Sequence, residues 1–434
     1  MIENKTYETS DETKCRAVLV GARCGETGED DFENEMLELK GLAKACDIEP
    51  LVTATQLLAN ENPATYIGSG KVAEVRSLTQ LYEADTVIFN NTLTPSQLNN
   101  LSKALEVEVI DRTGLILNIF SQRAQTKEAR LQVKYAQLRY ILPRLTGLRT
   151  NLSRQGGTGG SLSNKGSGEK QIELDRRKIE KEMAALKKEL SEVEKTRALQ
   201  RHSRSSSGLP LIALVGYTNA GKSTLMNRLI DTYGSNDAKK VYVQDMLFAT
   251  LDTTVRKLKS DTGRYFLLSD TVGFISKLPT DLVNAFHSTL EEALYADLIL
   301  EVVDSSDQNH LMHSLVTSQT LAKLGAGGIP RITVMNKSDK SCISDAPRAT
   351  DNKIYISAKQ GIGISELMDL IEKNLTFGHR LCELRIPYEN FGVENKIRST
   401  AQIINVEYKE DHILLKAYLD SAAQQKYLGY LIIP

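Results

Sequence analysis

The feature that most constrains the fold is a nine-residue stretch, GYTNAGKST, at residues 216–224. It follows the apolar run LIALV and precedes a helical pattern, so it matches G-x-x-x-x-G-K-[ST] in the required strand–loop–helix context. Its glycines let the backbone curl, so that successive N–H groups and a helix N-terminus face an anion. Lys222 adds a positive charge for the outer phosphates, and Ser223 offers a hydroxyl to Mg²⁺, which prefers oxygen ligands. The stretch therefore predicts a polyphosphate site and leaves adenine and guanine both open.

Three further motifs follow in order, each at the end of a predicted strand. DTVG (Asp270–Gly273) ends the run RYFLLSD, where the aspartate can hold Mg²⁺ through water and the glycine N–H can contact a γ-phosphate. NKSD (Asn336–Asp339) ends RITVM, and its carboxylate can accept two hydrogen bonds from guanine, whereas adenine lacks that donor pair. SAK (Ser357–Lys359) follows KIYI. Together the four motifs predict a guanine-nucleotide site.

Alternating strand-like and helical runs predict two α/β units separated by a helical segment. In residues 1–120, the runs CRAVLVGA, PLVTATQ, DTVIFN and VEVID alternate with helical patterns. Residues 209–377 repeat this organisation around the phosphate loop, and residues 381–434 are expected to form a small α+β domain. YIGSGKV at 66–72 resembles a phosphate loop but is too short for one, and a glycine turn before a helix explains it equally well.

Residues 121–204 are predicted to form an antiparallel helical hairpin. Apolar residues recur at steps of three and four on both sides of a Gly/Ser-rich loop at 149–168, which suits one seam between two helices. The segment RHSRSSSG at 201–208 is expected to act as a linker. The two stripes are Leu131, Tyr135, Leu138, Leu142 and Leu145 on the first helix, and Ile172, Ile179, Met183, Leu186, Leu190 and Val193 on the second.

Charge is distributed unevenly, although the net charge of the chain is −1. Residues 1–120 contain 10 lysines and arginines against 20 acids, whereas residues 121–204 contain 20 against 9. Within 121–165 the count is 9 against 1, and Glu128 is the only acid. This segment predicts contact with a polyanion. For 169–200, where both signs alternate, a solvated helical face is the preferred interpretation.

The glycine-rich loop cannot build a core, yet it joins two ordered helices. Its flanking side chains are Arg144, Arg149, Arg154 and Lys165. A basic, pliable segment rich in backbone donors suits folded RNA, which proteins recognise by shape and phosphate contacts. Because a structureless loop of this length is uncommon unless functional, we favour RNA contact over a connection without a partner.

We expect a cytoplasmic protein without a membrane anchor, acting as a monomer. The chain is 41% apolar with a mean hydropathy of −0.28, and no apolar run reaches the roughly 18 residues that span a bilayer. The N-terminal residues carry no signal pattern. His310 and His313 lack a third metal ligand and are expected at the surface. The scattered cysteines fit free thiols in a reducing compartment better than a disulfide framework or a zinc site: Cys15, Cys24, Cys46, Cys342 and Cys382.

The combination of GYTNAGKS, FATLD, DTVGF and NKSD, with the upstream GGTGGSLSNKGSGEKQIELDRRKI, resembles the HflX family of ribosome-associated GTPases over nearly the whole chain. The GTPase motifs are shared by the whole superfamily, whereas the glycine loop running into EKQIELDRR is more specific to the HflX family. The resemblance implies that the hairpin enters the large ribosomal subunit near the peptidyl-transferase region. It also implies that the GTP-bound protein dissociates 70S ribosomes in rescue or stress, accompanied in some relatives by antibiotic resistance.

The resemblance also implies residue roles. Thr250 in FATL would be the switch threonine that binds Mg²⁺ beside Ser223 and Asp270, and Lys222, Thr250 and Gly273 would act in hydrolysis. Spacing alone does not choose among Thr250, Thr253 and Thr254, and LDTT replaces a proline-containing sequence of many relatives. The SAK backbone would lie near the guanine oxygen. Asn219 corresponds to an asparagine that helps coordinate K⁺ in some related GTPases, which leaves K⁺ dependence open.

The expected nucleotide site therefore comprises the phosphate loop, the FATLD segment and the three downstream motifs. Its residues are Gly216, Tyr217, Thr218, Asn219, Ala220, Gly221, Lys222, Ser223, Thr224, Phe248, Ala249, Thr250, Leu251, Asp252, Asp270, Thr271, Val272, Gly273, Asn336, Lys337, Ser338, Asp339, Ser357, Ala358 and Lys359.

Phe274 stands directly after DTVG, where Ras-like GTPases carry a glutamine that orients the attacking water. A phenyl ring cannot hydrogen-bond that water, so we expect slow hydrolysis until a partner orders the switch loops. Two alternatives stay open: an RNA-binding module that GTP locks with incidental turnover, and a ribosome-assembly or RNA-processing GTPase. The sequence contains no tRNA-binding or one-carbon module, which disfavours a tRNA-modifying role.

Overall fold

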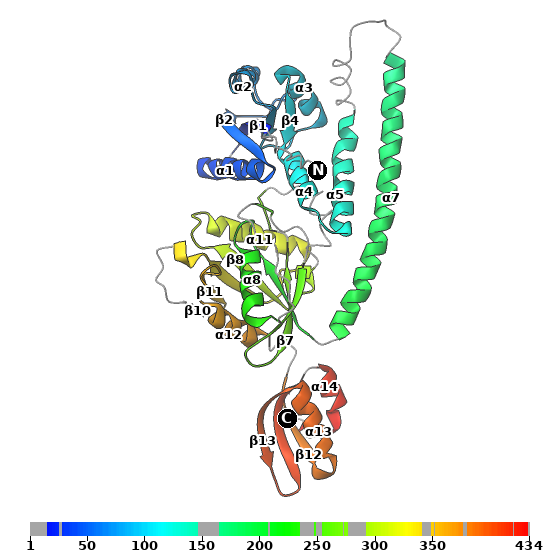
Figure 1. Ribbon diagram of the computed structural model, residues 1–434, viewed down its shortest axis with the longest axis vertical. Helices are drawn as coiled ribbons and strands as arrows, with labels where there is room; N and C mark the ends of the chain where they lie inside the picture. The colour runs from blue at the N-terminus through cyan, green and yellow to red at the C-terminus, as the bar shows by residue number, and fades with distance from the viewer. Residues whose placement is uncertain are drawn as a thin grey trace, which may run out of the picture.

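The computed structural model describes residues 15–25, 28–145, 165–206, 209–234, 247–248, 254–271, 273–276, 292–340, 349–350, 352–375, 380–419 and 421–432. An N-terminal α/β domain lies above a second α/β domain, and a small C-terminal domain forms the far end (Figure 1). A helical pair lies beside the N-terminal domain, and the longer of its two helices continues alongside the second α/β domain. Within the described part, no helix combines the length and the apolar character needed to cross a membrane.

The N-terminal domain is built on a four-stranded parallel sheet in the order β2-β1-β3-β4. Successive residues of the central strand β1 enter opposite cores: Val18 and Val20 join one buried cluster, whereas Ala17 and Leu19 join another. Both faces of the sheet are thus covered, as parallel sheets require. The elements are β1 (Cys15–Cys24), α1 (Glu29–Ala45), β2 (Ile48–Leu58), α2 (Ser69–Leu81), β3 (Thr86–Phe89), α3 (Pro95–Leu105) and β4 (Glu108–Asp111).

The GSGK stretch of this domain begins helix α2. The helix starts at Ser69, and the N–H of the preceding Gly68 donates to the Gln56 side-chain oxygen over 3.0 Å. This arrangement is the glycine turn before a helix that was one of the two sequence interpretations.

The helical pair consists of α5 (Lys127–Ile141) and α7 (Lys165–Ser206), joined by ion pairs from Lys134 to Glu182 and from Glu128 to Arg197. The predicted stripes are only half-buried apart from Leu186, because two helices alone cannot exclude water from their seam. Helix α5 instead buries a second, small-residue face. That face comprises Ala129, Val133 and Ala136, in one cluster with residues of α4 (Arg112–Arg123).

Two expected boundaries differ from the observed elements. The expected domain border at residue 120 falls inside α4, so this helix connects the N-terminal domain to the hairpin. The expected loop at 149–168 overlaps the first turn of α7, which begins at Lys165. Residues 146–164 lie outside the described part.

The second α/β domain contains a seven-stranded sheet in the order β10-β11-β9-β8-β5-β7-β6, parallel except at its two edges. Its carboxyl edge gathers the ends of β5, β7, β9 and β11, so all four sequence motifs meet there. The elements are β5 (Leu211–Val215), α8 (Lys222–Tyr233), β6 (Thr254–Lys259), β7 (Tyr265–Asp270), β8 (Leu298–Asp304), α11 (His310–Leu324), β9 (Arg331–Asn336), β10 (Ala349–Thr350), β11 (Lys353–Tyr355) and α12 (Ile364–Asn374).

The C-terminal domain is a three-stranded antiparallel sheet in the order β12-β14-β13 with helices packed on one face, which agrees with the expected α+β domain. The apolar alternations INVEY and HILLKAYL, which indicate strands in the sequence, lie in β13 and β14. The elements are β12 (Arg380–Pro387), α13 (Phe391–Thr400), β13 (Gln402–Tyr408), β14 (His412–Leu419) and α14 (Ser421–Lys426).

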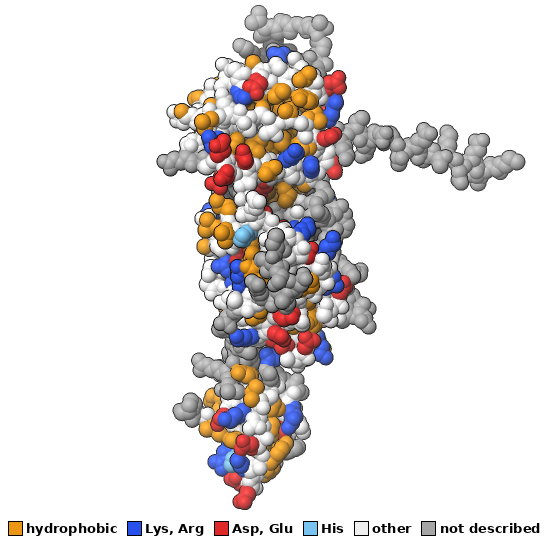
Figure 2. All heavy atoms as spheres, turned by 90° about the vertical axis from the view of Figure 1, so that its left-hand side faces the viewer, with side chains coloured by type: hydrophobic (Ala, Val, Ile, Leu, Met, Phe, Trp, Pro, Cys, Tyr) orange, Lys and Arg blue, Asp and Glu red, His pale blue; other side chains and the backbone are white. Residues whose placement is uncertain are grey.

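One hydrophobic cluster runs from the N-terminal domain into the second α/β domain. It contains Leu115 and Phe120 of α4 together with Phe248 of the FATLD motif, Phe274 of the DTVGF motif and the adjacent Ile275. On the outer face near this boundary, acidic side chains gather on the lower part of the N-terminal domain (Figure 2). The two domains therefore share a core beside the predicted nucleotide site.

Candidate nucleotide site

The phosphate loop turns at two glycines whose backbone excludes any other residue. Gly216 has φ +144°, and a Cβ there would lie 2.2 Å from the Val302 carbonyl oxygen. Gly221 has φ +93°, and a Cβ there would lie 2.2 Å from Asn336 Nδ2. Gly221 is also the residue before helix α8, so the loop ends in the free N–H groups of a helix N-terminus. This arrangement is suited to a phosphate chain.

Two buried ionisable residues, Lys222 and Asp270, lie beside the loop. Lys222 Nζ donates to the carbonyl oxygens of Gly216 and Tyr217 over 3.0 and 2.9 Å, and Ser223 Oγ donates to Asp270 over 2.9 Å. Burial lowers the pKa of Lys222 to about 8, which the nearby Asp270 partly offsets. Burial likewise raises the pKa of Asp270 to about 6, against the effects of Lys222 and Ser223. A phosphate ion bound here would stabilise the charged lysine.

The residues present fit a magnesium ion. Asp270 Oδ1 is buried and has no hydrogen-bond partner among the described residues, although a buried carboxylate oxygen normally has one. It lies on the same carboxylate that accepts from Ser223, so two hard oxygen ligands are adjacent. Thr271, next in the chain, is buried and donates its hydroxyl to the Leu214 carbonyl over 2.6 Å, a structural contact within the sheet.

The base-recognition motifs are linked to the phosphate loop through Asn336. Its Nδ2 donates to the Ala220 carbonyl over 2.9 Å, and its Oδ1 accepts from the Ala358 N–H over 3.0 Å. Lys337 Nζ donates to the Asn219 carbonyl over 2.8 Å and pairs with Asp304 over 2.7 Å. The asparagine and the lysine thus fix three loops relative to one another.

The carboxylate expected to bind guanine is oriented by the SAK loop. Asp339 is exposed, and its Oδ1 accepts from the Ser357 hydroxyl over 2.6 Å. Arg228 of helix α8 supports the SAK loop from behind, because it donates to the carbonyls of Ala358 and Lys359 over 3.0 and 2.6 Å. Of the remaining predicted residues, Thr224 and Ser338 are half-buried, and Asn219 and Lys359 are exposed.

The segment after β7 folds back onto the phosphate loop. The Thr218 N–H donates to the Phe274 carbonyl over 2.8 Å, and the Phe274 N–H donates to the Gly216 carbonyl over 3.0 Å. The phenyl ring of Phe274 is 2% exposed and lies in the shared hydrophobic cluster. The ring therefore points away from the place where a water-orienting side chain would act.

The FATLD segment is only partly described. Phe248 is buried and packs edge-to-face against Phe120 of α4, with ring centroids 4.7 Å apart, so its side chain contacts the N-terminal domain instead of lining the phosphate loop. Ala249, Thr250, Leu251, Asp252 and Val272 lie outside the described residues, and the assignment of Thr250 to Mg²⁺ stays a prediction. Thr254 lies opposite Asp270 in the antiparallel register of β6 and β7. The buried hydroxyl of Thr254 has no hydrogen-bond partner among the described residues.

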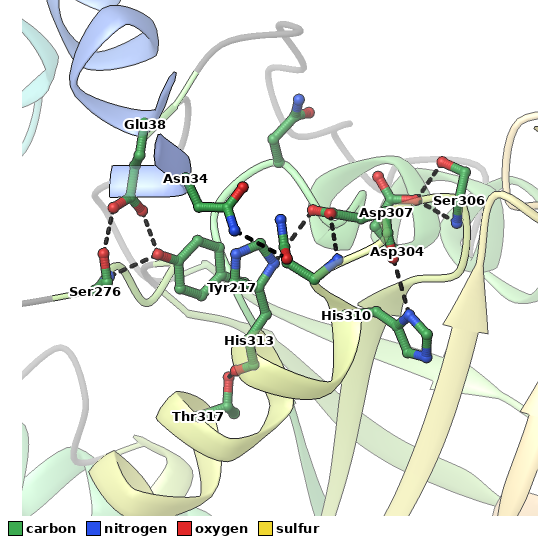
Figure 3. Close-up of polar contacts among 12 residues, drawn as sticks. Asn34, Glu38, Tyr217, Ser276, Asp304, Ser306, Asp307, His310, His313 and Thr317 are labelled. Carbon is green, nitrogen blue, oxygen red and sulfur yellow. Dashed lines mark hydrogen bonds and ion pairs between the residues drawn. The ribbon is translucent and has the colours of Figure 1, made fainter. Parts of the chain in front are cut away.

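A polar cluster that the sequence did not predict joins this site to helix α1 (Figure 3). The Glu38 carboxylate accepts hydrogen bonds from the hydroxyls of Tyr217 and Ser276 and pairs with the guanidinium of Arg112. The Ser276 N–H donates to Tyr217 Oη over 2.7 Å, and Arg112 donates to the Ser276 carbonyl over 3.1 Å. Tyr217, expected to contact nucleotide, thus directs its side chain toward the N-terminal domain.

A cleft of about 790 Å³ lies beside this cluster, between α1, the phosphate loop and α11. His313 stacks on the Tyr217 ring with centroids 3.8 Å apart and pairs with Asp307, so it is half-buried instead of freely exposed. Asn34 donates to the Asn309 side chain over 3.1 Å, which adds a further contact between the domains. Within the described ranges, no group of three or more His, Cys, Asp or Glu side chains could hold a metal ion.

Three family models match successive parts of the chain. Residues 33–121 match the model described as GTP-binding GTPase N-terminal, residues 123–204 match GTP-binding GTPase Middle Region, and residues 211–337 match 50S ribosome-binding GTPase. The three matches follow one another in the order of the observed N-terminal domain, helical pair and second α/β domain.

Several curated relatives are similar along most of their length. A GTPase HflX of Caldanaerobacter subterraneus is 42% identical over 96% of this chain and 94% of its own. A GTPase HflX of Escherichia coli is 37% identical over 89% of each chain. Among solved structures, a GTP-binding protein from Sulfolobus solfataricus in complex with GDP is 23% identical, with a TM-score of 0.44 over 83% of this chain and 99% of its own.

Proposed function

The chain belongs to the HflX family of GTPases, and on this premise we propose that it binds the large ribosomal subunit in the cytoplasm under control of bound GTP. The observation that carries the proposal is the presence, in one chain, of a complete set of guanine-nucleotide motifs and a basic helical segment. The first provides a switch with two ligand states, and the second provides a surface for ribosomal RNA.

In this proposal the nucleotide is held from both ends. Asp339, oriented by Ser357, accepts the guanine donors, and the N–H groups of the phosphate loop and Lys222 hold the phosphates. Loss of the contacts at either the base or the phosphates would leave the nucleotide poorly positioned. Hydrolysis would then slow, because positioning supplies most of the catalysis in phosphoryl transfer.

Ser223, Asp270 and the threonine Thr250 are the proposed magnesium ligands. When bound, the ion would neutralise charge on the β- and γ-phosphates. Asn219 is the proposed K⁺ ligand; its backbone adopts φ +60° and its side chain is exposed at the top of the phosphate loop.

Hydrolysis by the isolated protein is expected to be slow. The Phe274 ring is buried in the shared cluster and offers no hydrogen bond to water, so no side chain at this position can orient the nucleophile. We propose that contact with the ribosome orders the switch loops and accelerates hydrolysis. GTP hydrolysis would then release the protein after 70S ribosomes have been split.

The ribosome contact is assigned to the first hairpin helix and the loop that follows it. Exposed basic side chains line α5 at Lys127, Arg130, Lys134 and Arg139, of which Lys134 pairs with Glu182 of α7. On α7, Arg176 and Arg177 pair with acids one turn away on the same helix, as expected of a solvated face. The basic character available to RNA is therefore concentrated toward 121–165.

Sedimentation of the purified protein with 70S ribosomes tests the proposal. With a non-hydrolysable GTP analogue we expect the protein to sediment with 50S particles and the 70S peak to fall, whereas GDP should support neither. Raising the salt from 50 to 200 mM should weaken binding at least tenfold, because phosphate contacts release counterions. Equal sedimentation with GTP analogue and GDP, or at both salt concentrations, would contradict the proposal.

A second candidate is an RNA-binding module that GTP locks without productive turnover. The buried Phe274 favours it, because the protein lacks the water-orienting side chain. Turnover measured with and without 50S subunits separates the two: stimulation supports the first proposal, and an unchanged rate supports the second.

A further inference from the structure

Two segments at the γ-phosphate end of the nucleotide site rest on the N-terminal domain. Leu247 approaches Gly41 of α1, where a Cβ on the glycine would lie 3.0 Å from Leu247 Cδ1. Phe248 packs against Phe120 of α4, and Ser276 contacts the Glu38–Arg112 pair. By contrast, the described contacts of the base end come from within the second α/β domain.

The contact between Glu38 and Arg112 is buried. The side chains of Arg112 and Glu38 are 3% and 11% exposed, so their interaction is little screened by solvent. Burial and the neighbouring Glu38 raise the pKa of Tyr217, so its hydroxyl stays protonated and donates to the carboxylate. Tyr217 Oη simultaneously accepts from the Ser276 N–H, so one phenol joins the phosphate loop, the segment after DTVG and helix α1.

The Gly273 segment packs closely against the phosphate loop. A Cβ on Gly273 would lie 2.9 Å from Lys222 Nζ, and equally close to Thr218 Cα and Cγ2. Lys222 Nζ itself donates to the Gly216 and Tyr217 carbonyls. A phosphoryl group hydrogen-bonded to both the lysine and the Gly273 N–H needs about 2.8–3.0 Å on each side, so we expect the lysine, the Gly273 segment or both to rearrange when GTP binds.

We propose that Glu38 is a positioning residue of the GTPase site, which holds the segment at Ser276 inward through Tyr217 and thereby favours GDP over GTP. Movement of Gly273 also displaces Phe274 and Ser276, which follow it in the chain. The backbone of Phe274 is hydrogen-bonded to Gly216 and Thr218. Ser276 is hydrogen-bonded to Tyr217 and Glu38. A γ-phosphate that displaces Gly273 therefore weakens the hold of the N-terminal domain. By linkage, a partner that draws α1 away strengthens GTP binding by the same factor.

The inference rests on the proposed function only for the identity of the nucleotide, and its test needs no ribosome. Full-length protein carrying Tyr217→Phe keeps the ring that stacks on His313 and loses the hydroxyl. Affinities for GDP and for a non-hydrolysable GTP analogue are measured by fluorescence titration with Mg²⁺. We expect the analogue to gain about tenfold relative to GDP, as the loss of hydrogen bonds to a charged group predicts.

Glu38→Gln tests the same contact from the other domain and guards against a folding defect in the first variant. Glu38 belongs to the N-terminal domain, 179 residues from Tyr217 along the chain, and is not one of the phosphate-loop residues. A shift in the GDP-to-analogue ratio in Glu38→Gln therefore cannot come from a lost phosphate contact. Tyr408→Phe is the matched control, because it removes a phenol that donates to the buried Glu394 over 3.1 Å in the C-terminal domain.

A general folding defect weakens both nucleotides alike and leaves their ratio unchanged, whereas the proposed role changes the ratio. An unchanged ratio in a folded Tyr217→Phe or Glu38→Gln protein overturns the inference, and so does a ratio that shifts toward GDP. A wild-type protein that binds no guanine nucleotide would instead refute the proposed function, so the two failures are distinguishable.

Discussion

The two ends of the nucleotide site are constructed differently. At the base end, Asn336, Asp339 and Ser357 contact one another or the neighbouring loops of their own domain. At the γ-phosphate end, Phe248 and Ser276 contact α4 and α1 of the N-terminal domain. The base end can therefore recognise its ligand without reference to the rest of the molecule, whereas the γ-phosphate end cannot change without changing a domain interface.

This difference separates recognition from response. A rigid, local base site gives the same affinity for guanine in GDP and GTP, so it carries no information about nucleotide state. Only the γ-phosphate end can report that state, and it does so where contacts between domains are available to be broken. The following changes test the division, beginning with the largest expected effect.

Asp339→Asn should weaken GDP and GTP alike by about 10²–10³-fold, because the amide cannot accept both guanine donors and its own N–H groups oppose them. Titration with both nucleotides measures the effect, and xanthine nucleotides provide a positive test because their C2 oxygen accepts where guanine donates. Loss of GTP affinity alone would show that the two ends are not independent.

Phe120→Ala should reduce the free energy of unfolding by about 3–5 kcal/mol, since the ring is fully buried against Phe248 in the cluster shared by both domains. Urea denaturation measures this loss, and Phe120→Leu serves as the matched control because it keeps most of the volume. A loss below about 1 kcal/mol would mean that the domains do not share a core at this point.

Excision of residues 149–164 should weaken binding to 50S subunits about tenfold, because Arg149 and Arg154 are removed with the loop. GDP affinity should stay unchanged, since the described nucleotide-site residues lie in another domain. Co-sedimentation and nucleotide titration of the same preparation check both halves. Retention of full particle binding would remove the loop from the proposed interface.

Arg228→Gln has the smallest expected effect, about threefold to tenfold weaker binding of both nucleotides. The guanidinium supports the SAK loop through the carbonyls of Ala358 and Lys359, and its loss lets that loop move without removing a ligand contact. Titration should give an unchanged GDP-to-GTP ratio. This result would contrast with the shifted ratio expected for Tyr217→Phe at the other end.

The same contrast explains what could be predicted from the sequence. GYTNAGKST, DTVG, NKSD and SAK are contiguous motifs at strand ends, so their residue types and order locate the base and phosphate positions directly. Glu38 and Ser276 are 238 residues apart, and Glu38 is one acid among several on α1. A contact between two individually ordinary residues has no local pattern that would reveal it.

Two features of the fold were not predicted from the sequence, for similar physical reasons. Strand β6, TVRKLK, is rich in basic residues and gives no apolar alternation. It lies at the edge of the sheet, where charged side chains prevent pairing with other chains. The half-buried stripes of α5 and α7 followed the predicted period, but the buried face of α5 is made of Ala129, Val133 and Ala136. Small residues of this kind give a weak periodic signal.

Hydrogen exchange on the full-length protein tests most directly whether the γ-phosphate and the N-terminal domain compete for the DTVGF segment. With a non-hydrolysable GTP analogue in place of GDP, we expect faster exchange in peptides covering Ser276 and the contact face of α1 around Glu38. Peptides covering Asn336–Asp339 should exchange equally with both nucleotides. Unchanged or slower exchange at Ser276 and α1 with the analogue would contradict the account.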